Sequence, residues 1–212
     1  ANLRNGGRLI RYDELENHSC LTPQLIADIR ARRDCLKSPP TCFKIDNSSR
    51  CNIDCIMCTR HLHRDDKELI KATSCEVERY LPGAKSVIFT GIGYPFCIPH
   101  MRDWLTSKES KYQDLQFNLI TNGLLIADYW EKIKHRRFGP ILISIDAATK
   151  GTYERVRVGG DWDRLHAGLA IVRENRALFA SVATNMTVMR LNYREIPAFI
   201  DMSESYGFDV SF

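Results

Sequence analysis

The sequence has no apolar run long enough to cross a membrane, and its first residues lack the apolar core of a signal peptide. It also has no internal repeat and no low-complexity segment. Its 30 Lys and Arg residues exceed its 26 Asp and Glu residues by only four, and both kinds are dispersed along the chain. We therefore expect a cytoplasmic protein with a mixed-charge, solvated surface, and neither a membrane nor a nucleic acid as partner.

The chain begins at Ala1 without an initiator methionine and stops at Phe212, inside an apolar run that resembles a strand. We therefore expect a C-terminally truncated fragment whose missing sequence bears on substrate choice. Its 212 residues, 44% of them hydrophobic, are enough for one core with a small appendage. The double proline at positions 39 and 40 predicts a boundary between an N-terminal extension, residues 1–40, and a core domain, residues 41–212.

Short apolar runs alternate with helical patterns along the core domain. Segments such as Val87–Phe89 and Ile141–Ile143 are apolar on both faces, as in parallel strands buried on both sides. This alternation predicts an α/β fold with a parallel sheet and right-handed crossovers, either an open barrel or a doubly wound sheet. The predicted strands cover residues 43–46, 86–90, 116–121, 141–146, 181–189 and 208–212, and the predicted helices cover 24–33, 69–80, 101–105, 126–133, 165–176 and 196–206.

Three of the eight cysteines lie within eight residues, in the pattern Cys51-x3-Cys55-x2-Cys58. Three thiolates this close can converge on one metal centre, but they cannot complete four-coordination. Either a histidine such as His61 or His63 joins them around zinc, or one position stays open, as in an iron–sulfur cluster that binds a small molecule. Structural zinc motifs usually use paired cysteines far apart in sequence, so the spacing favours the cluster. The other cysteines show no ligand spacing.

Polar or glycine-rich motifs follow the predicted strands at their carboxyl ends, where parallel α/β folds build their sites. The cysteine loop follows the first strand, and Gly91–Tyr94 follows the second. Thr121–Gly123, Ser144–Asp146 and Asn185–Met189 lie at the next three. We therefore expect these five motifs to meet at one rim of the sheet.

Together these motifs resemble the radical S-adenosylmethionine (radical SAM) superfamily. The three-cysteine pattern after a first strand looks like the signature of that superfamily, and the resemblance spans roughly residues 40–212. The stretch Ser144–Gly160 is similar to the branch whose members often carry a C-terminal auxiliary-cluster (SPASM) domain.

The resemblance implies a partial (β/α)6 barrel that holds a [4Fe–4S] cluster through Cys51, Cys55 and Cys58. The fourth iron would bind the amino and carboxylate groups of S-adenosylmethionine. Reductive cleavage of this cosubstrate would give a 5′-deoxyadenosyl radical that abstracts hydrogen from a substrate. A peptide or protein is the expected substrate, with a sugar or aminocyclitol as the alternative. A flavodoxin- or ferredoxin-type protein is the expected electron donor.

The family also implies roles for residues at the other strand ends. Gly91 and Gly93 would present backbone carbonyls to the ammonium group of S-adenosylmethionine, since glycine permits close approach. Tyr94 stands where relatives usually have Glu, and it cannot supply a carboxylate. Thr121 and Ser144 match positions that hydrogen-bond the ribose or the amino-acid end. The remaining matches are Asp146, to fix its strand end, Arg157, to reach the carboxylate of S-adenosylmethionine, and Val188 and Met189, to border the adenine.

Two non-catalytic hypotheses stand beside the enzyme. The first is a binding module stabilised by zinc. The second is a barrel that keeps the cluster but only binds a partner, an alternative that the tyrosine at position 94 keeps open.

Overall fold

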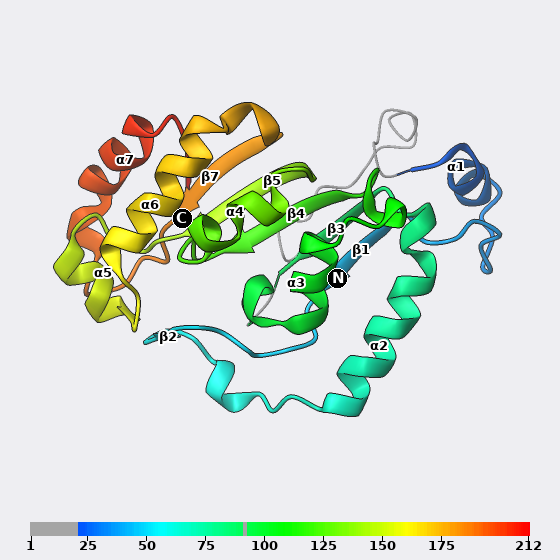
Figure 1. The fold of residues 1–212 in the computed structure, drawn as a ribbon, viewed down its shortest axis with the longest axis horizontal. Coiled ribbons are helices and arrows are strands. Elements are labelled where there is room, and N and C mark those ends of the chain that lie inside the picture. Colours follow the sequence, from blue (N-terminus) through cyan, green and yellow to red (C-terminus); the bar gives the residue numbers. More distant parts are fainter. Residues whose placement is uncertain (1–20, 91–92) are drawn as a thin grey trace.

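The computed structural model describes residues 21–90 and 93–212. Its main feature is a six-stranded parallel sheet whose spatial order follows the order in the chain (Figure 1). Because consecutive strands are neighbours at every step, the winding of the sheet never reverses, which is the arrangement of a barrel wall. The strands are β1 (Cys42–Ile45), β3 (Ser86–Phe89), β4 (Gln116–Thr121), β5 (Arg137–Ser144), β7 (Ser181–Asn185) and β8 (Asp209–Ser211).

The helices connect consecutive strands and cover one face of the sheet, because right-handed crossovers in a constant direction return over the same side. In Figure 1, α3, α4 and α6 lie over this side. Strand residues alternate accordingly: Phe117 and Leu119 of β4 are buried, whereas Asn118 and Ile120 face the open side and are half-exposed. The helices are α2 (Lys67–Tyr80), α3 (Pro99–Thr106), α4 (Ile126–Ile133), α5 (Lys150–Val156), α6 (Trp162–Glu174) and α7 (Ile196–Ser205).

The parallel α/β sheet confirms the fold class predicted from the sequence, and β4 and α4 have the predicted bounds. The fourth predicted strand was expected to run from Ile141 to Asp146, but β5 ends at Ser144. The reason is that Asp146 adopts a φ of +65°, a left-handed conformation outside the extended region.

Two further differences concern short or distorted segments. β7 ends at Asn185, not at Met189, because the side chain of Asn192 bonds the backbone of the segment that follows. The sequence did not predict α5, nor the ribbon in which β2 (Asp54–Cys55) pairs antiparallel with β6 (Arg157–Val158). Two-residue strands carry no periodicity, so no sequence pattern could indicate them.

The described part of the N-terminal segment contains α1 (Pro23–Arg30), close to the predicted helix over 24–33. Asp28 of this helix is buried and accepts hydrogen bonds from the backbone N–H and the hydroxyl of Ser38, both at 3.0 Å. Lys85 donates a hydrogen bond to the carbonyl of Leu21 at 2.8 Å and so joins this segment to the core. The domain boundary at residue 40 stays a prediction.

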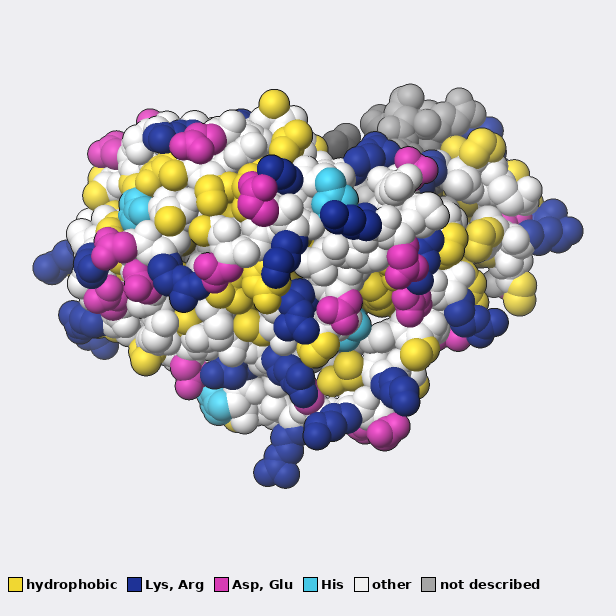
Figure 2. Space-filling model, viewed as in Figure 1, with side chains coloured by type: hydrophobic (Ala, Val, Ile, Leu, Met, Phe, Trp, Pro, Cys, Tyr) yellow, Lys and Arg dark blue, Asp and Glu magenta, His cyan; other side chains and the backbone are white. Residues whose placement is uncertain are grey.

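The surface is mixed in charge, as expected from the sequence. Figure 2 shows Lys and Arg side chains distributed over the visible face with Asp and Glu side chains between them. Within residues 21–90 and 93–212, no helix is long and apolar enough to cross a membrane.

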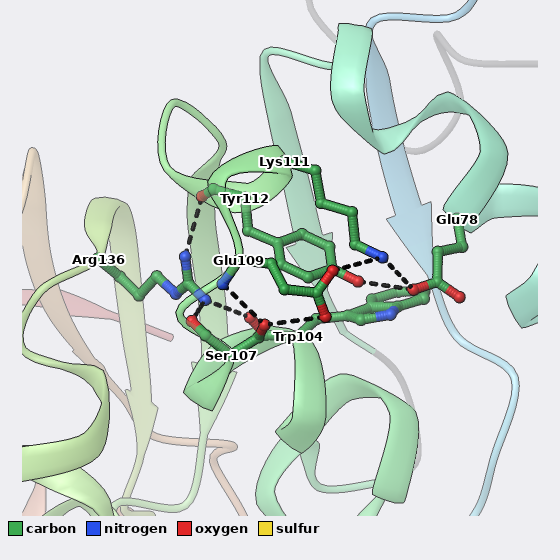
Figure 3. A network of polar contacts seen from close by, with 7 residues as sticks. All are labelled: Glu78, Trp104, Ser107, Glu109, Lys111, Tyr112 and Arg136. Atoms are coloured by element: carbon green, nitrogen blue, oxygen red, sulfur yellow. Dashed lines mark hydrogen bonds and ion pairs between the residues drawn. The ribbon is translucent and has the colours of Figure 1, made fainter.

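A buried arginine joins the end of α3 to the start of β5 (Figure 3). Arg136 is 4% exposed, and its guanidinium donates hydrogen bonds to the carbonyl oxygens of Leu105 at 2.9 Å, Trp104 at 3.0 Å and Tyr112 at 3.0 Å, and also to that of Ser107. Helices leave their last carbonyls without intrahelical partners, so this side chain caps α3.

The same region is closed from the other side by a carboxylate (Figure 3). Oε1 of Glu78, on α2, accepts hydrogen bonds from the hydroxyl of Tyr112 at 2.6 Å and from Lys111 at 3.1 Å. These hydrogen bonds lower the pKa of Glu78, that from Tyr112 contributing most. The two networks together connect α2, α3 and β5.

We predict that Arg136→Met lowers the free energy of unfolding by roughly 2–4 kcal/mol, because it leaves several buried carbonyls without a donor. Urea denaturation of the full chain measures this. The neighbouring exposed residue supplies the control, since Arg137→Met should change stability by less than about 0.5 kcal/mol. Equal losses in the two variants would show that Arg136 does not cap α3.

Candidate functional site

The loop that carries the three cysteines is closed at its base by one carboxylate. Oδ2 of Asp65 accepts a hydrogen bond from the hydroxyl of Ser48 at 2.6 Å, and Oδ1 accepts from the N–H of Ser49 at 2.7 Å. Burial would raise the pKa of Asp65, but these hydrogen bonds hold it below its usual value. The charged carboxylate therefore joins the residues just before the cysteines to residues just after them.

Gly93 lets this loop approach the sheet. A Cβ at position 93 would lie 2.2 Å from the carbonyl oxygen of Ser48 and 2.7 Å from Cδ1 of Ile98. The N–H of the following residue, Tyr94, donates to the carbonyl of Arg50 at 2.7 Å. The glycine is thus required for close backbone packing here. Gly91, the other predicted glycine, lies outside the described residues.

The far side of the cysteine loop is fixed by the β2–β6 ribbon, toward which the loop crosses the end of the sheet (Figure 1). In this ribbon Cys55 is the direct partner of Arg157. The N–H of Ile56 donates to the carbonyl of Val156 at 3.0 Å, and the N–H of Cys58 donates to the carbonyl of Cys55 at 3.0 Å. The second and third cysteines therefore lie in a hydrogen-bonded turn.

A cavity of about 210 Å³ lies between the cysteine loop and the carboxyl ends of the strands. All three cysteines of the motif line it, and so do most of the other residues singled out in the sequence. Its lining consists of Cys51, Cys55, Met57, Cys58, Gly93, Tyr94, Ile120, Thr121, Asn122, Ser144, Asp146, Arg157 and Thr187.

Tyr94 and Thr121 are engaged in contacts within the protein. The side chain of Tyr94 is 2% exposed, and its hydroxyl accepts a hydrogen bond from the N–H of Leu125 at 3.2 Å. Burial raises the pKa of this phenol, so it stays neutral. The Thr121 hydroxyl accepts from the N–H of Gly123 at 3.1 Å. Both side chains brace the start of α4, whereas Ser144 lies half-exposed at the end of β5.

Asn122, which the sequence analysis treated only as part of a turn, contacts the cysteine loop. Its Nδ2 donates to Oδ1 of Asn52 at 2.8 Å and lies 3.9 Å from Sγ of Cys51. Its Oδ1 accepts from the N–H of Leu124 at 3.1 Å. The side chain is 5% exposed, and the hydrogen bonds of Nδ2 and Oδ1 fix both atoms of its amide.

A buried ion pair lies on the other side of the cavity. Nη2 of Arg157 is 2.5 Å from Oδ2 of Asp146, and Nη1 donates toward Sγ of Cys55 at 3.6 Å. Oδ1 of Asp146 accepts from the N–H of Thr187 at 2.7 Å. Burial would lower the pKa of Arg157, but the nearby acidic groups, Asp146 foremost among them and Cys55 next, together raise it above its usual value. Burial raises the pKa of the Cys55 thiol, which Arg157 partly offsets.

The segment after β7 is hydrogen-bonded to the backbone of Asp146, one member of this ion pair. Asn192 is fully buried and donates from Nδ2 to the carbonyl oxygens of Asp146 and Thr187, each at 2.9 Å. Thr187, which the sequence analysis did not single out, lines the cavity. Val188 is 48% exposed and Met189 is half-exposed, and neither belongs to the cavity lining.

The histidines of the zinc hypothesis lie elsewhere. His61 and His63 are exposed, and His63 lines a different cavity with Asp65 and Asp66. In the described part of the chain, no three His, Cys, Asp or Glu side chains are grouped to hold a single metal ion.

The other described cysteines do not line the cavity beside the three-cysteine loop. Cys75 is exposed on α2, and burial raises the pKa of Cys97 to about 11. No disulfide joins two of the described cysteines.

The residues around the cavity fit a [4Fe–4S] cluster. Thiolates are the protein ligands of such clusters, and three thiols here line one space. Nε of Arg157 is buried and has no hydrogen-bond partner among the described residues. The site thus offers three sulfur donors for the cluster. Beside them it offers a fixed cation, Arg157, whose Nε–H can donate a hydrogen bond to a bound ligand.

The sequence model of the Radical SAM superfamily matches residues 48–203. This chain therefore belongs to the radical SAM superfamily, whose members use a [4Fe–4S] cluster and S-adenosylmethionine.

Among curated proteins, the chain is 22% identical over 178 residues to a probable GTP 3′,8-cyclase of Methanocaldococcus jannaschii. It is also 22% identical over 184 residues to the GTP 3′,8-cyclase of Clostridium botulinum strain Hall. These alignments cover 78% and 80% of this chain, but 55% and 54% of the relatives. The chain thus spans about half the length of the curated relatives it matches.

Solved structures share the fold. Streptococcus suis SuiB bound to S-adenosylmethionine is 18% identical with a TM-score of 0.60, over 87% of this chain and 43% of SuiB. Native anSMEcpe with bound AdoMet and Cp18Cys peptide is 21% identical with a TM-score of 0.58, over 81% of this chain and 50% of that one.

We predict that Gly93→Ala lowers the free energy of unfolding by roughly 1–3 kcal/mol, because the new Cβ meets backbone that cannot move aside. Gly83→Ala is the matched control, since a Cβ there meets nothing within 4 Å. Urea denaturation of both variants gives the comparison. If the two variants unfold at the same urea concentration, the close approach of the cysteine loop to Gly93 is not as described.

Proposed function

We propose that this chain is the catalytic core of a radical SAM enzyme, with Cys51, Cys55 and Cys58 as ligands of its [4Fe–4S] cluster. When bound, the cluster and S-adenosylmethionine supply a 5′-deoxyadenosyl radical for hydrogen abstraction. One observation carries this proposal: three thiols from a single loop line the same cavity as the carboxyl ends of β4 and β5. The zinc hypothesis has less support, since its two histidines are exposed and lie outside that cavity.

The residues of this chain would orient the cofactors and shield them. Arg157 places a buried cation beside the cavity, suited to the carboxylate of S-adenosylmethionine. Ser144 offers a half-exposed hydroxyl at the end of β5. Tyr94 closes one side of the cavity with a neutral, hydrogen-bonded ring.

The proposed substrate is a peptide or protein, and the open face of the sheet supports this. A second cavity of about 300 Å³ adjoins the first, and Ile120 lines both. All the side chains that line the second cavity are uncharged. They are Ile88, Asn118, Leu119, Ile120, Pro140, Ile141, Leu142, Ser181 and Ala183. Such a surface suits a neutral, largely apolar group, as many amino-acid side chains are. Two structural neighbours were solved with peptides bound, anSMEcpe with Cp18Cys and SuiB with SuiA.

A nucleotide is the second candidate substrate, because the curated relatives are GTP 3′,8-cyclases. Proteins recognise a triphosphate with Arg and Lys side chains, and neither residue type lines the second cavity.

The relation to the SPASM branch, and a flavodoxin- or ferredoxin-type electron donor, stay proposals. The chemistry consumes one electron, which a partner of this kind would supply.

We predict that Cys51→Ala, Cys55→Ala and Cys58→Ala each lower the iron content after anaerobic reconstitution from roughly four atoms per chain to below one. Each should also abolish release of 5′-deoxyadenosine on reduction with dithionite in the presence of S-adenosylmethionine. Cys75→Ala is the control, because that thiol is exposed on α2 and should change neither value. Full iron loading in any of the three site variants would contradict the assigned ligands.

We further predict that GTP does not raise the yield of 5′-deoxyadenosine from the reduced, reconstituted protein. Adenosine triphosphate serves as a control for unspecific effects of triphosphates. Consumption of GTP in step with 5′-deoxyadenosine formation would overturn the peptide proposal and establish the nucleotide instead.

A further inference from the structure

Two buried side chains direct N–H groups at two of the three sulfur ligands proposed above. Nη1 of Arg157 lies 3.6 Å from Sγ of Cys55, and Nδ2 of Asn122 lies 3.9 Å from Sγ of Cys51. Among the described side chains, none donates such a hydrogen bond to Sγ of Cys58. We infer that Arg157 and Asn122 raise the reduction potential of the cluster through N–H···S hydrogen bonds, an inference that rests on the proposed function.

Arg157 is held in this position by the fold. Its backbone belongs to β6, where it pairs with Cys55 across the ribbon, so the two side chains share one short stretch of sheet. Its guanidinium is fixed by Asp146, which is fully buried and held in turn by the N–H of Thr187. The hydrogen bond to Cys55 therefore needs no rearrangement when a cluster binds.

Asn122 is fixed just as firmly, from the other side of the cavity. It follows β4, and its side-chain oxygen Oδ1 accepts a hydrogen bond from the N–H of Leu124. The same amide nitrogen that contacts Cys51 also bonds Asn52, inside the cysteine loop. The two donors thus come from different segments, the turn after β4 and strand β6, and approach different cysteines.

The direction of the effect follows from charge. Reduction adds one negative charge to the cluster, and this charge is shared with the thiolate sulfurs. An N–H dipole aimed at such a sulfur stabilises the reduced form more than the oxidised form, so the potential rises. The charge of Asp146 offsets that of Arg157, so the directed N–H group, and not net positive charge, is the main cause for this residue.

A competing role for Arg157 is to bind the carboxylate of S-adenosylmethionine alone. That role has no effect on a cluster without S-adenosylmethionine. A potential measured without the cosubstrate therefore separates the two roles.

The test is a redox titration of the reconstituted full chain, followed by electron paramagnetic resonance and carried out without S-adenosylmethionine. Arg157→Lys keeps a cation beside Asp146 but lacks the fork that reaches both the carboxylate and the sulfur. We expect the ratio of reduced to oxidised cluster at a fixed potential to fall about tenfold, which is 59 mV for a one-electron couple. Arg155→Lys, an exposed position on α5, is the control and should leave the potential unchanged.

Asn122→Ala gives an independent measurement if Arg157→Lys does not take up a cluster. It removes the donor to Cys51 without a change of charge, and we expect a shift in the same direction. Unchanged potentials in the loaded variants, with a normally loaded parent protein, overturn this inference and leave the proposed function standing. A parent protein that takes up no cluster overturns the proposed function and this inference together.

Discussion

The buried ion pair between Arg157 and Asp146 is the contact on which the site depends. It joins three segments that are distant in sequence, because Arg157 also reaches Cys55 and Asp146 also holds Thr187. Two opposite charges are retained in an almost dry environment only where both are well bonded, and here each has further partners. Asp146 adopts its left-handed backbone conformation in this setting, and such strained positions cluster at functional sites.

The rest of the rim is assembled around this pair by small constraints of backbone packing. Gly93 lets the carbonyl of Ser48 come into contact with the backbone that follows β3. Asp65 closes the base of the cysteine loop through its hydrogen bond with Ser48. Asn192 ties the segment after β7 to the end of β5. The parallel pairing of the strands brings these segments to one rim, because every carboxyl end in such a sheet points the same way.

Much of this arrangement could be predicted from the sequence. The alternation of buried strands and helices indicated a parallel sheet, and β4 and α4 have their expected bounds. The sequence could not show that Cys55 and Arg157, about a hundred positions apart, pair in a two-residue ribbon, because such pairing is a tertiary event without periodicity. Asn122 and Thr187 were missed for a related reason: each looks like an ordinary turn or loop residue until its partner is known. For Tyr94 the residue type excluded a carboxylate, but only the fold shows that its hydroxyl accepts from Leu125.

The central claim is that three protein thiolates leave one iron of the cluster free for S-adenosylmethionine. The most direct measurement is electron–nuclear double resonance on the reduced, reconstituted protein with S-adenosylmethionine labelled with ¹⁵N at its amino group. Our account predicts a hyperfine coupling between this nitrogen and the cluster. A fully loaded cluster that shows no coupling to the labelled nitrogen would contradict it.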